Sequence, residues 1–278
     1  MRWIRISSLF ALGLFVVRGF TTTQAANILV VAGTDSYAQA AGVVLNGELT
    51  TAGNTVTVVN AGVPGSLAGF TQIYDTRYDN LPAFTAGEMS QYLAFLQAAP
   101  GNTLFLMGEN TFFNTHNLLI NSFIALAGGG TVPAPSFLST NSETVNPPFN
   151  GPNAISTVKF AACGRVSSPG RGAFASSESG GGCALFFGTG ALTNALQSAL
   201  VVVYDVNFIA TAQTFGAVNE ISFRQNLEHF VSAPTVAPTP GGGPAPVPTP
   251  TLTTWGEILL AAALCGTGVI LIRRRTVV

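Results

Sequence analysis

Short runs of consecutive apolar residues, separated by longer helical patterns, most constrain what this chain can fold into. Residues 27–33 read Asn-Ile-Leu-Val-Val-Ala-Gly, residues 103–107 read Thr-Leu-Phe-Leu-Met, and residues 200–204 form a third run. A strand that is apolar along its whole length is typical of a parallel sheet that is covered on both faces. The runs therefore predict an α/β domain with a mostly parallel sheet and helices on both faces.

The segments between these runs supply the helices and the remaining strands. The second helix has the clearest start, because Thr85 and Glu88 match a capping box. Its apolar face is expected to comprise Met89, Tyr92, Leu93 and Leu96. Helices are expected at 37–51, 85–98, 116–127 and 219–231, strands at 55–60, 72–75 and 155–160, and a Gly-, Pro- and Asn-rich insertion at 128–152.

The first 25 residues have the pattern of a secretory signal peptide. Arg2 and Arg5 form a positive start, residues 9–17 form an apolar run too short to span a membrane, and Thr23-Gln24-Ala25 is a small-x-small cleavage pattern. The mature chain is then expected to begin at Ala26. The alternatives are a first strand or an uncleaved anchor.

The other end of the chain predicts a spacer followed by a membrane segment. Residues 233–251 hold seven of the 16 prolines, which indicates a semi-rigid, extended linker after a domain at 26–232. Residues 255–272 are apolar except for Glu257, and they precede Arg273, Arg274 and Arg275. This pattern predicts a transmembrane helix with its arginines in the cytoplasm. A simple membrane anchor is the main alternative, and a buried core helix is a weaker one.

A short motif in this tail points to processing. Pro250-Thr-Leu-Thr-Thr-Trp-Gly256 resembles the Ile-Pro-Thr-Leu-x-x-Trp-Gly signal of exosortase-processed bacterial surface proteins, a relative of the PEP-CTERM class, although Thr249 stands where that signal has Ile. The resemblance implies a tripartite sorting signal over residues 252–278 together with Pro250. The residues it assigns to sorting are Pro250, Thr251, Leu252, Trp255, Gly256, Arg273, Arg274 and Arg275.

The same resemblance implies a route and partners. The chain would be exported by the Sec machinery and held in the inner membrane with its C-terminus in the cytoplasm. An exosortase-like protease or transpeptidase would then act on it. The mature form would lie at the surface of a Gram-negative-type bacterium or outside the cell, where envelope or extracellular polysaccharide is a candidate partner.

Charge excludes one class of partner. Residues 27–232 hold eleven acidic and five basic residues, so the exported part carries a charge of −6. No basic patch is visible in the sequence, which argues against nucleic acid as a partner.

Two of the three cysteines fall in the exported part. Cys163 and Cys183 are expected to form a disulfide, because disulfides persist outside the cytoplasm. Two buried free thiols are the alternative. Closing such a loop stabilises a fold by about 3 kcal/mol. No Cys or His cluster has zinc spacing, and neither a metal nor a cofactor is expected.

Polar residues follow several of the predicted strands. Ligands of open α/β sheets bind beyond the carboxyl ends of the strands, so these residues are candidates for a site. Asp and Asn also cap helices and hold turns at such positions, which is the alternative reading. The catalytic candidates are Asp35, Glu109 and Asp205, and the ligand-binding candidates are Asp75, Arg77, Asp79, Asn110, His116 and Asn207.

Residues 27–231 resemble the class I glutamine amidotransferase-like superfamily, which has a flavodoxin-like fold. The resemblance lies in Leu104-Phe-Leu-Met-Gly-Glu-Asn110, a strand that runs into a tight turn at the place of the family's nucleophile, and in Val203-Tyr-Asp-Val-Asn207. Active members have a cysteine where this chain has Glu109. The resemblance therefore implies the fold without that family's nucleophilic chemistry.

Two function classes follow. The first is a non-catalytic exported protein whose α/β domain binds a ligand or partner in the cell envelope or extracellular matrix. The second is a secreted, glycan-directed hydrolase in which Asp35 or Glu109 works with Asp205, provided that two carboxyl groups lie about 5–10 Å apart. The arrangement of these carboxyl groups in a pocket would separate the two classes.

Overall fold

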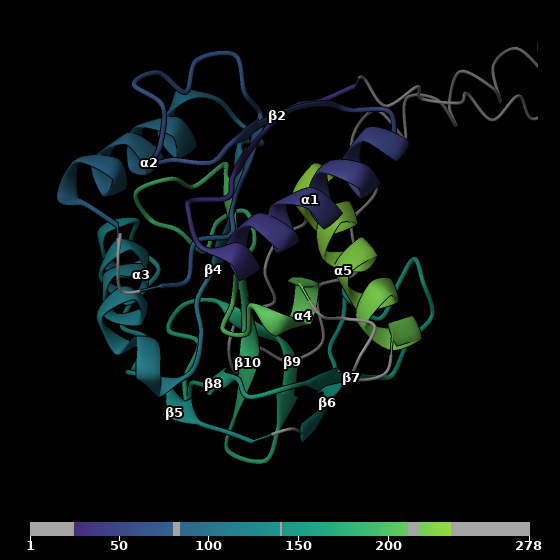
Figure 1. Cartoon of the computed structure of the whole chain (residues 1–278). Coiled ribbons are helices and arrows are strands. Elements are labelled where there is room, and N and C mark those ends of the chain that lie inside the picture. The colour runs from purple at the N-terminus through teal and green to yellow at the C-terminus, as the bar shows by residue number, and fades with distance from the viewer. Residues whose placement is uncertain (1–24, 80–83, 140, 211–216, 235–278) are drawn as a thin grey trace, which may run out of the picture.

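The computed structural model describes residues 25–79, 84–139, 141–210 and 217–234, which form a mixed sheet with helices on both faces (Figure 1). In chain order the helices are α1 (Ser36–Thr51), α2 (Ala86–Ala98), the 3-10 helix η1 (Thr111–Phe113), α3 (Asn114–Leu126), α4 (Asn207–Ala210) and α5 (Ala217–Ser232). The strands are β1 (Asn27–Val31), β2 (Thr55–Val59), β3 (Gln72–Asp75), β4 (Thr103–Met107), β5 (Ser136–Phe137), β6 (Asn141–Val145), β7 (Thr157–Phe160), β8 (Gly164–Arg165), β9 (Ala173–Glu178), β10 (Gly181–Phe187) and β11 (Ala199–Val203).

The large sheet has nine strands in the order β2-β1-β3-β4-β11-β10-β9-β6-β7. The first five are parallel, and the remaining pairings are antiparallel. By position along the chain, the parallel half has the order 2-1-3-4-5, which is common in doubly wound α/β sheets. In this order the chain reverses direction across the sheet between β1 and β3, so the crevice beyond these two strands is the expected ligand position.

Two apolar layers hold the helices on the sheet, because alternate residues of each strand point to opposite faces. Ile28 and Val30 of β1 pack in the layer that contains the buried side chains of α1, α4 and α5. Leu29 and Val31 pack in the layer under α2 and α3. The predicted α/β fold with helices on both faces is therefore confirmed.

The predicted strands at 27–33, 55–60, 103–107 and 200–204 are confirmed as neighbours or near neighbours in the parallel half. The predicted helices are also present, and α2 has the expected capping box between Thr85 and Glu88. Within its apolar face Tyr92 and Leu96 are buried, whereas Met89 and Leu93 are half-buried.

Of the antiparallel half, only the strand expected at 155–160 was predicted, and it is present as β7. The insertion expected at 128–152 contains β5 and β6, and the Gly- and Ser-rich segment between the two cysteines forms the hairpin of β9 and β10. A Cβ atom at Gly181 would lie 2.1 Å from the Val166 carbonyl oxygen, and one at Gly182 would lie 2.2 Å from that of Ser176. These glycines allow neighbouring backbones to approach closely inside the sheet. In the sequence, a segment so rich in glycine and serine has the composition of a loop, so the strands were not expected there.

The predicted disulfide between Cys163 and Cys183 is present. It ties the segment before β8 to the fully buried strand β10, and its Cα atoms lie 6.0 Å apart. No helix among the described residues is long and apolar enough to cross a membrane. The predicted transmembrane helix, the sorting motif, nearly all of the signal peptide and most of the linker lie outside the described residues.

Candidate functional site

Four of the five parallel strands, β1, β3, β4 and β11, place most of the predicted site residues along one edge of the sheet. We call this the carboxyl edge. It holds Asp35, Asp75, Arg77, Asp79, Glu109, Asn110, Asp205 and Asn207. The sequence therefore identified the edge correctly, and the surroundings of each side chain decide what it can do.

A small hollow lies where β1 and β3 end, and it contains Asp35, Arg77, Tyr78 and Asp79. Gly33 has a φ of +65°, and a Cβ atom there would lie 2.8 Å from Cγ of Arg77, so a glycine leaves room for the arginine side chain. The hollow occupies the expected ligand position between β1 and β3.

Asp35 works as the N-cap of α1. Its Oδ1 accepts hydrogen bonds from the backbone amides of Tyr37 at 2.8 Å and Ala38 at 3.2 Å. It is also hydrogen-bonded to the Tyr78 side chain, and burial together with this bond raises the pKa of Tyr78. Asp35 is thus engaged in structural bonds even though it lines the hollow.

Asp75 and Arg77 form the centre of a buried ionic cluster. Arg77 Nη2 lies 2.6 Å from Asp75 Oδ2, and the Tyr92 hydroxyl donates to the same oxygen at 2.6 Å. Arg77 Nη1 donates to Glu88 Oε1 at 2.8 Å, and the guanidinium stacks 5.2 Å from the ring centre of Phe84. Asp75 and Arg77 therefore balance each other's charge and hydrogen bonds inside the protein, and they stabilise the fold.

Glu88 also belongs to this cluster. The sequence predicted its part in the capping box but not its ion pair with Arg77. Burial would raise its pKa, but hydrogen bonds from the Val63 and Thr85 amides and the charge of Arg77 lower it overall. Glu88 therefore joins the start of α2, the loop at Val63 and the end of β3.

His116 lies inside the protein. Its Nε2 is 3.1 Å from the carbonyl oxygen of Met107, and its ring packs 4.8 Å from that of Phe84. Burial lowers its pKa, so the imidazole is neutral at pH 7. His116, a candidate for ligand binding, is fully buried and therefore has a structural role instead.

Glu109 and Asp205 form a buried acidic pair at the ends of β4 and β11. Glu109 Oε2 accepts from the Val206 amide at 2.8 Å, and its Oε1 accepts from the Asn110 amide at 2.9 Å. The Asp205 oxygens accept from the amides of Ala161 at 2.7 Å and Asn207 at 2.9 Å.

The two carboxyl groups share an environment that opposes charge. Burial and the charge of Asp205 raise the pKa of Glu109 to about 8, and burial raises the pKa of Asp205 to about 6. Each carboxylate oxygen named above is bound by a backbone amide, and Glu109 is only 2 % exposed. The pair therefore links the ends of two strands to the loops beside them and offers no open face to a substrate.

The turn that carries Glu109 differs from a nucleophile elbow. A Cβ atom at Gly108 would lie 2.4 Å from Cδ1 of Tyr204, so the turn needs a glycine before Glu109. Among the described residues only glycines have positive φ, so Glu109 is not held in the strained conformation that exposes a nucleophile. In addition, neither Glu109 nor Asp205 lines the hollow that holds Asp35.

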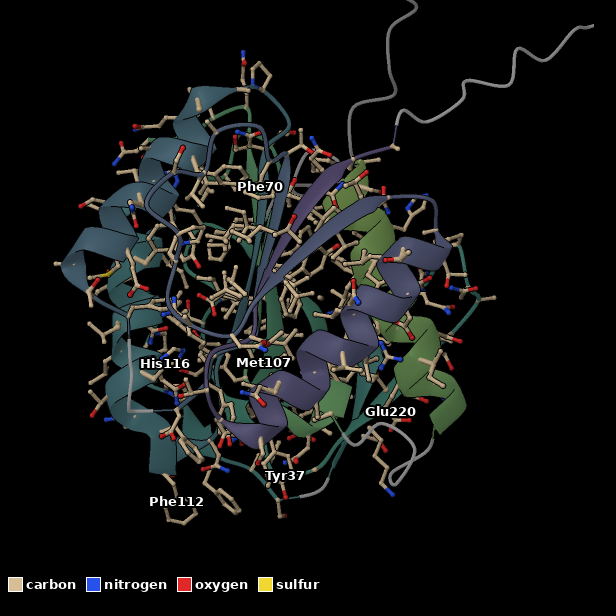
Figure 2. All side chains as sticks on the ribbon, turned by 45° about the horizontal axis from the view of Figure 1, so that its top comes forward. Tyr37, Phe70, Met107, Phe112, His116 and Glu220 are labelled. Carbon is tan, nitrogen blue, oxygen red and sulfur yellow. A yellow bond between two sulfur atoms is a disulfide. The ribbon has the colours of Figure 1, made fainter. Side chains whose placement is uncertain are left out.

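The carboxyl edge also exposes aromatic side chains that the sequence analysis did not select. Tyr37 is 47 % exposed, Phe112 is 77 % exposed and Phe137 is 49 % exposed. The rings of Phe112 and Phe137 lie 6.0 Å apart, and those of Phe113 and Tyr78 lie 5.0 Å apart. Figure 2 shows Tyr37 and Phe112 at one end of the molecule and Phe70 toward the other. We call Tyr37, Tyr78, Phe112, Phe113 and Phe137 the aromatic row. Its only sequence signal is a Phe-Phe pair placed directly after a strand-end turn.

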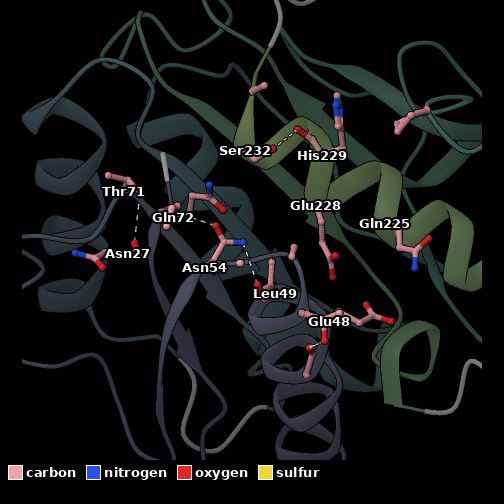
Figure 3. Close-up of a pocket in the computed structure, with 18 of the residues that line it drawn as sticks. Asn27, Glu48, Leu49, Asn54, Thr71, Gln72, Gln225, Glu228, His229 and Ser232 are labelled. Atoms are coloured by element: carbon pink, nitrogen blue, oxygen red, sulfur yellow. Dashed lines mark hydrogen bonds between the residues drawn. The ribbon is translucent and has the colours of Figure 1, made fainter. Parts of the chain in front are cut away.

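A larger hollow lies at the opposite, amino edge of the sheet (Figure 3). It has a volume of about 1070 Å³ and is lined by the starts of β1 and β3 and the C-terminal parts of α1 and α5. The lining includes Ala25, Ala26, Ser232 and Ala233, so both ends of the described domain meet there. None of the predicted site residues lies in this hollow.

One group of side chains in the described part of the chain has the spacing of metal ligands. It comprises Glu143, Cys163 and Cys183, whose ligand atoms lie within 4.8 Å of one another. The two sulfur atoms are joined in the disulfide, and Glu143 accepts hydrogen bonds from the Ser176 hydroxyl and the Cys183 amide. In this oxidised form the group is part of the core.

No protein-family model matches the sequence, and no curated protein matches it. Two similar solved structures are ThuA-like proteins. The one from Bacteroides uniformis ATCC 8492 is 11 % identical, covers 76 % of this chain and 93 % of its own, and has a TM-score of 0.46. The one from Parabacteroides merdae ATCC 43184 is 12 % identical, covers 82 % of this chain and 96 % of its own, and has a TM-score of 0.48.

Proposed function

We propose that this chain is an exported, C-terminally sorted protein of the cell surface or extracellular matrix, and that its α/β domain binds a partner without catalysis. The signal-peptide pattern of residues 1–25 and the motif and arginines of residues 250–278 support export and sorting. The 2-1-3-4-5 order of the parallel strands supports a flavodoxin-like, glutamine amidotransferase-like fold.

The observation that carries the proposal is the placement of the chain ends relative to the three exposed members of the aromatic row, Tyr37, Phe112 and Phe137. Ala25 and Ala233 line the hollow at the amino edge, and the aromatic row lies at the carboxyl edge. A linker that leaves the domain after Ala233 would hold the amino edge toward the cell. The carboxyl edge would then face outward, where a partner can reach it.

The acidic residues of the carboxyl edge are already bound by groups of the protein itself, which supports a non-catalytic role. A general acid or base must reach a substrate proton directly or through one water molecule. Asp35 caps a helix, Asp75 is bound by Arg77, and Glu109 and Asp205 are buried against backbone amides. The geometry therefore favours binding over a hydrolase that uses these strand-end carboxyl groups.

The partner that best fits the carboxyl edge is a neutral polysaccharide of the envelope or extracellular matrix. Exposed aromatic rings stack on the C–H-rich faces of sugar rings, and Phe112 and Phe137 present two rings side by side. Asp79, which lines the small hollow beside Tyr78, supplies an acceptor for sugar hydroxyl groups. The acidic balance of residues 27–232 disfavours a strongly anionic polymer.

Affinity electrophoresis of the domain through gels that contain extracellular polysaccharide from the native cells tests this proposal. We expect the polysaccharide to retard the wild-type domain. Because stacking on an aromatic side chain can contribute 1–3 kcal/mol by analogy with nucleobases, replacing both Phe112 and Phe137 by alanine should weaken binding by at least about tenfold.

Leu196→Ala provides the matched control, because Leu196 is 57 % exposed and lies just before β11, at the amino edge. This variant should migrate like the wild type. If the double phenylalanine variant is retarded as strongly as the wild type, or if no polysaccharide retards the wild type, the carboxyl edge is not a polysaccharide site.

A further inference from the structure

The hollow at the amino edge has a negative electrostatic character. The C-terminal turns of α1 and α5 both line it, and helix C-termini carry partial negative charge. Its charged or titratable lining residues among those described are Glu48, Glu228 and His229. Figure 3 shows the side chains of Glu48 and Glu228 between the two helices.

Arg224 forms its ion pair with Glu48, and its charge lowers the pKa of Glu228 only in part. It binds Glu48 in a bidentate manner, with Nε 2.7 Å from Oε2 and Nη2 2.6 Å from Oε1. Burial, followed by the charge of Glu48 and a hydrogen bond to it, raises the pKa of Glu228 to about 9. Oε1 of Glu228 is buried and has no hydrogen-bond partner among the described residues. Glu228 therefore needs either a proton or another cation beside it.

The residue that follows the predicted signal-peptide cleavage point lies at this hollow. Ala26 lines it, and the Ala26 amide donates to Oδ1 of Asn54 at 3.1 Å. The Ala26 carbonyl accepts from the Thr55 amide at 3.0 Å, which fixes the residue at the start of the sheet. Asn54 also donates to the Leu49 carbonyl at the end of α1. The nitrogen of Ala26 is thus held close to the C-terminus of a helix.

We infer that the amino-edge hollow is a binding site for a primary ammonium group, and that its occupant is the α-ammonium group of Ala26 in the mature protein. Hydrolysis of the Ala25–Ala26 bond by a signal peptidase adds one water molecule. The oxygen stays with the departing Ala25 carboxylate, and the Ala26 nitrogen becomes an ammonium group. This inference rests on the proposed export of the chain.

Cleavage changes what the Ala26 nitrogen can do. An amide donates one hydrogen bond, whereas an ammonium group has three donors and a positive charge. Asn54 Oδ1 retains the first bond, and the partial negative charge of the carbonyl groups at the end of α1 attracts the ammonium group. Removal of the signal peptide would therefore stabilise the folded domain.

The test compares three forms that all contain residues 26–278 whole and that differ only at their amino terminus. One begins with free Ala26, one begins with N-acetylated Ala26, and one retains Gln24 and Ala25. At pH 6.5 the free-amine form should have a melting temperature about 1–4 °C higher than the other two.

The difference in stability between the forms should depend on pH in a defined direction. An α-amine that gains partners on folding has a pKa above the ordinary 7.7–8.0. Its stabilisation is complete below that range and is lost as the pH rises through the folded value. The difference between the forms should therefore vanish by about pH 10. An equal melting temperature at pH 6.5, or a difference that persists at pH 10, would overturn the inference.

One variant and one control separate this effect from general destabilisation. Asn54→Ala should shrink the difference between the free and acetylated forms, because it removes the acceptor of the Ala26 nitrogen, whatever it does to the stability of both forms. Glu178→Gln, in the hairpin of β9 and β10, should preserve the difference. Sequencing the amino terminus of the exported protein is a separate measurement. A different natural start would refute the cleavage prediction without changing the result for the defined forms.

Discussion

Nη2 of Arg77 lies 2.6 Å from Oδ2 of Asp75, although the two residues are separated by a single residue at the end of β3. The arginine turns back over its own strand, and Gly33 provides the space for it. Both side chains are almost fully buried, at 4 % and 0 % exposure. Polar residues at the carboxyl edge of this sheet can therefore stabilise the fold from inside the protein without facing a ligand.

Breaking this pair should destabilise the domain strongly. Arg77→Met leaves the buried Asp75 carboxylate without its cation, and removing one partner of a buried pair typically costs about 3–5 kcal/mol. Urea denaturation followed by circular dichroism measures the change. Arg165→Met is the control, because the Arg165–Glu178 pair is 30 % exposed on both sides and should contribute less than about 1 kcal/mol. Equal losses in the two variants would contradict the central role of the Asp75–Arg77 pair.

The buried acidic pair predicts a pH dependence of stability. The pKa of Glu109 rises from 4.5 to about 8 on folding, and that of Asp205 rises from 3.8 to about 6. The folded state therefore binds more protons than the unfolded state between these values. The free energy of unfolding should fall as the pH rises from 5 to 9.

Glu109→Gln should flatten this slope between pH 5 and pH 8, because the amide does not titrate. The quantity to compare is the slope of the free energy of unfolding against pH. The absolute stability will also fall, because glutamine has one acceptor oxygen whereas Glu109 accepts hydrogen bonds at both of its oxygens. Glu178→Gln should leave the slope unchanged. A stability that rises with pH across this range in the wild type would show that burial does not hold the pair in its protonated form.

The parallel half of the fold was predictable because β1, β4 and β11 are almost entirely apolar and because helix α2 has a local start signal in Thr85 and Glu88. In the antiparallel half only β7 was predicted. In β10, Gly181 and Gly182 have the composition of a loop, yet they are buried where neighbouring carbonyl groups leave no space for a side chain. That requirement comes from residues in other strands, so no local pattern reveals it.

The candidate site divides in a similar way. Strand-end positions located Asp35, Asp75 and Glu109 along the carboxyl edge, because parallel strands all end there. Their roles could not be predicted, because they depend on partners distant in sequence. The amide of Val206 that binds Glu109 is 97 residues away, and Arg77 reaches Glu88 eleven residues later.

The disulfide gives a third prediction. Replacing Cys163 and Cys183 by serine should lower the free energy of unfolding by about 3 kcal/mol, because the bond closes a loop between residues 20 apart. Both cysteines are fully buried, so a thiol reagent should label them only after reduction and unfolding. Cys265→Ser lies outside the domain and should have no effect on this unfolding transition. Labelling of Cys163 or Cys183 in protein that has been unfolded but not reduced would contradict the disulfide.

The final prediction concerns the C-terminal tail. If the sorting motif functions, the mature protein recovered from the cell envelope or medium should lack Arg273, Arg274 and Arg275, with a new end near residues 250–255. Mass spectrometry of the intact protein measures this end. A permanent anchor would require only the apolar segment and the arginines, so it would retain them.

Replacing Pro250, Thr251 and Leu252 by alanine should trap the unprocessed form in the inner membrane, while the circular dichroism of the domain stays unchanged. Replacing Pro244, Val247 and Pro248 by alanine in the preceding linker is the matched control and should leave processing intact. Recovery of the wild-type chain with its arginines still attached would show that the tail is only an anchor.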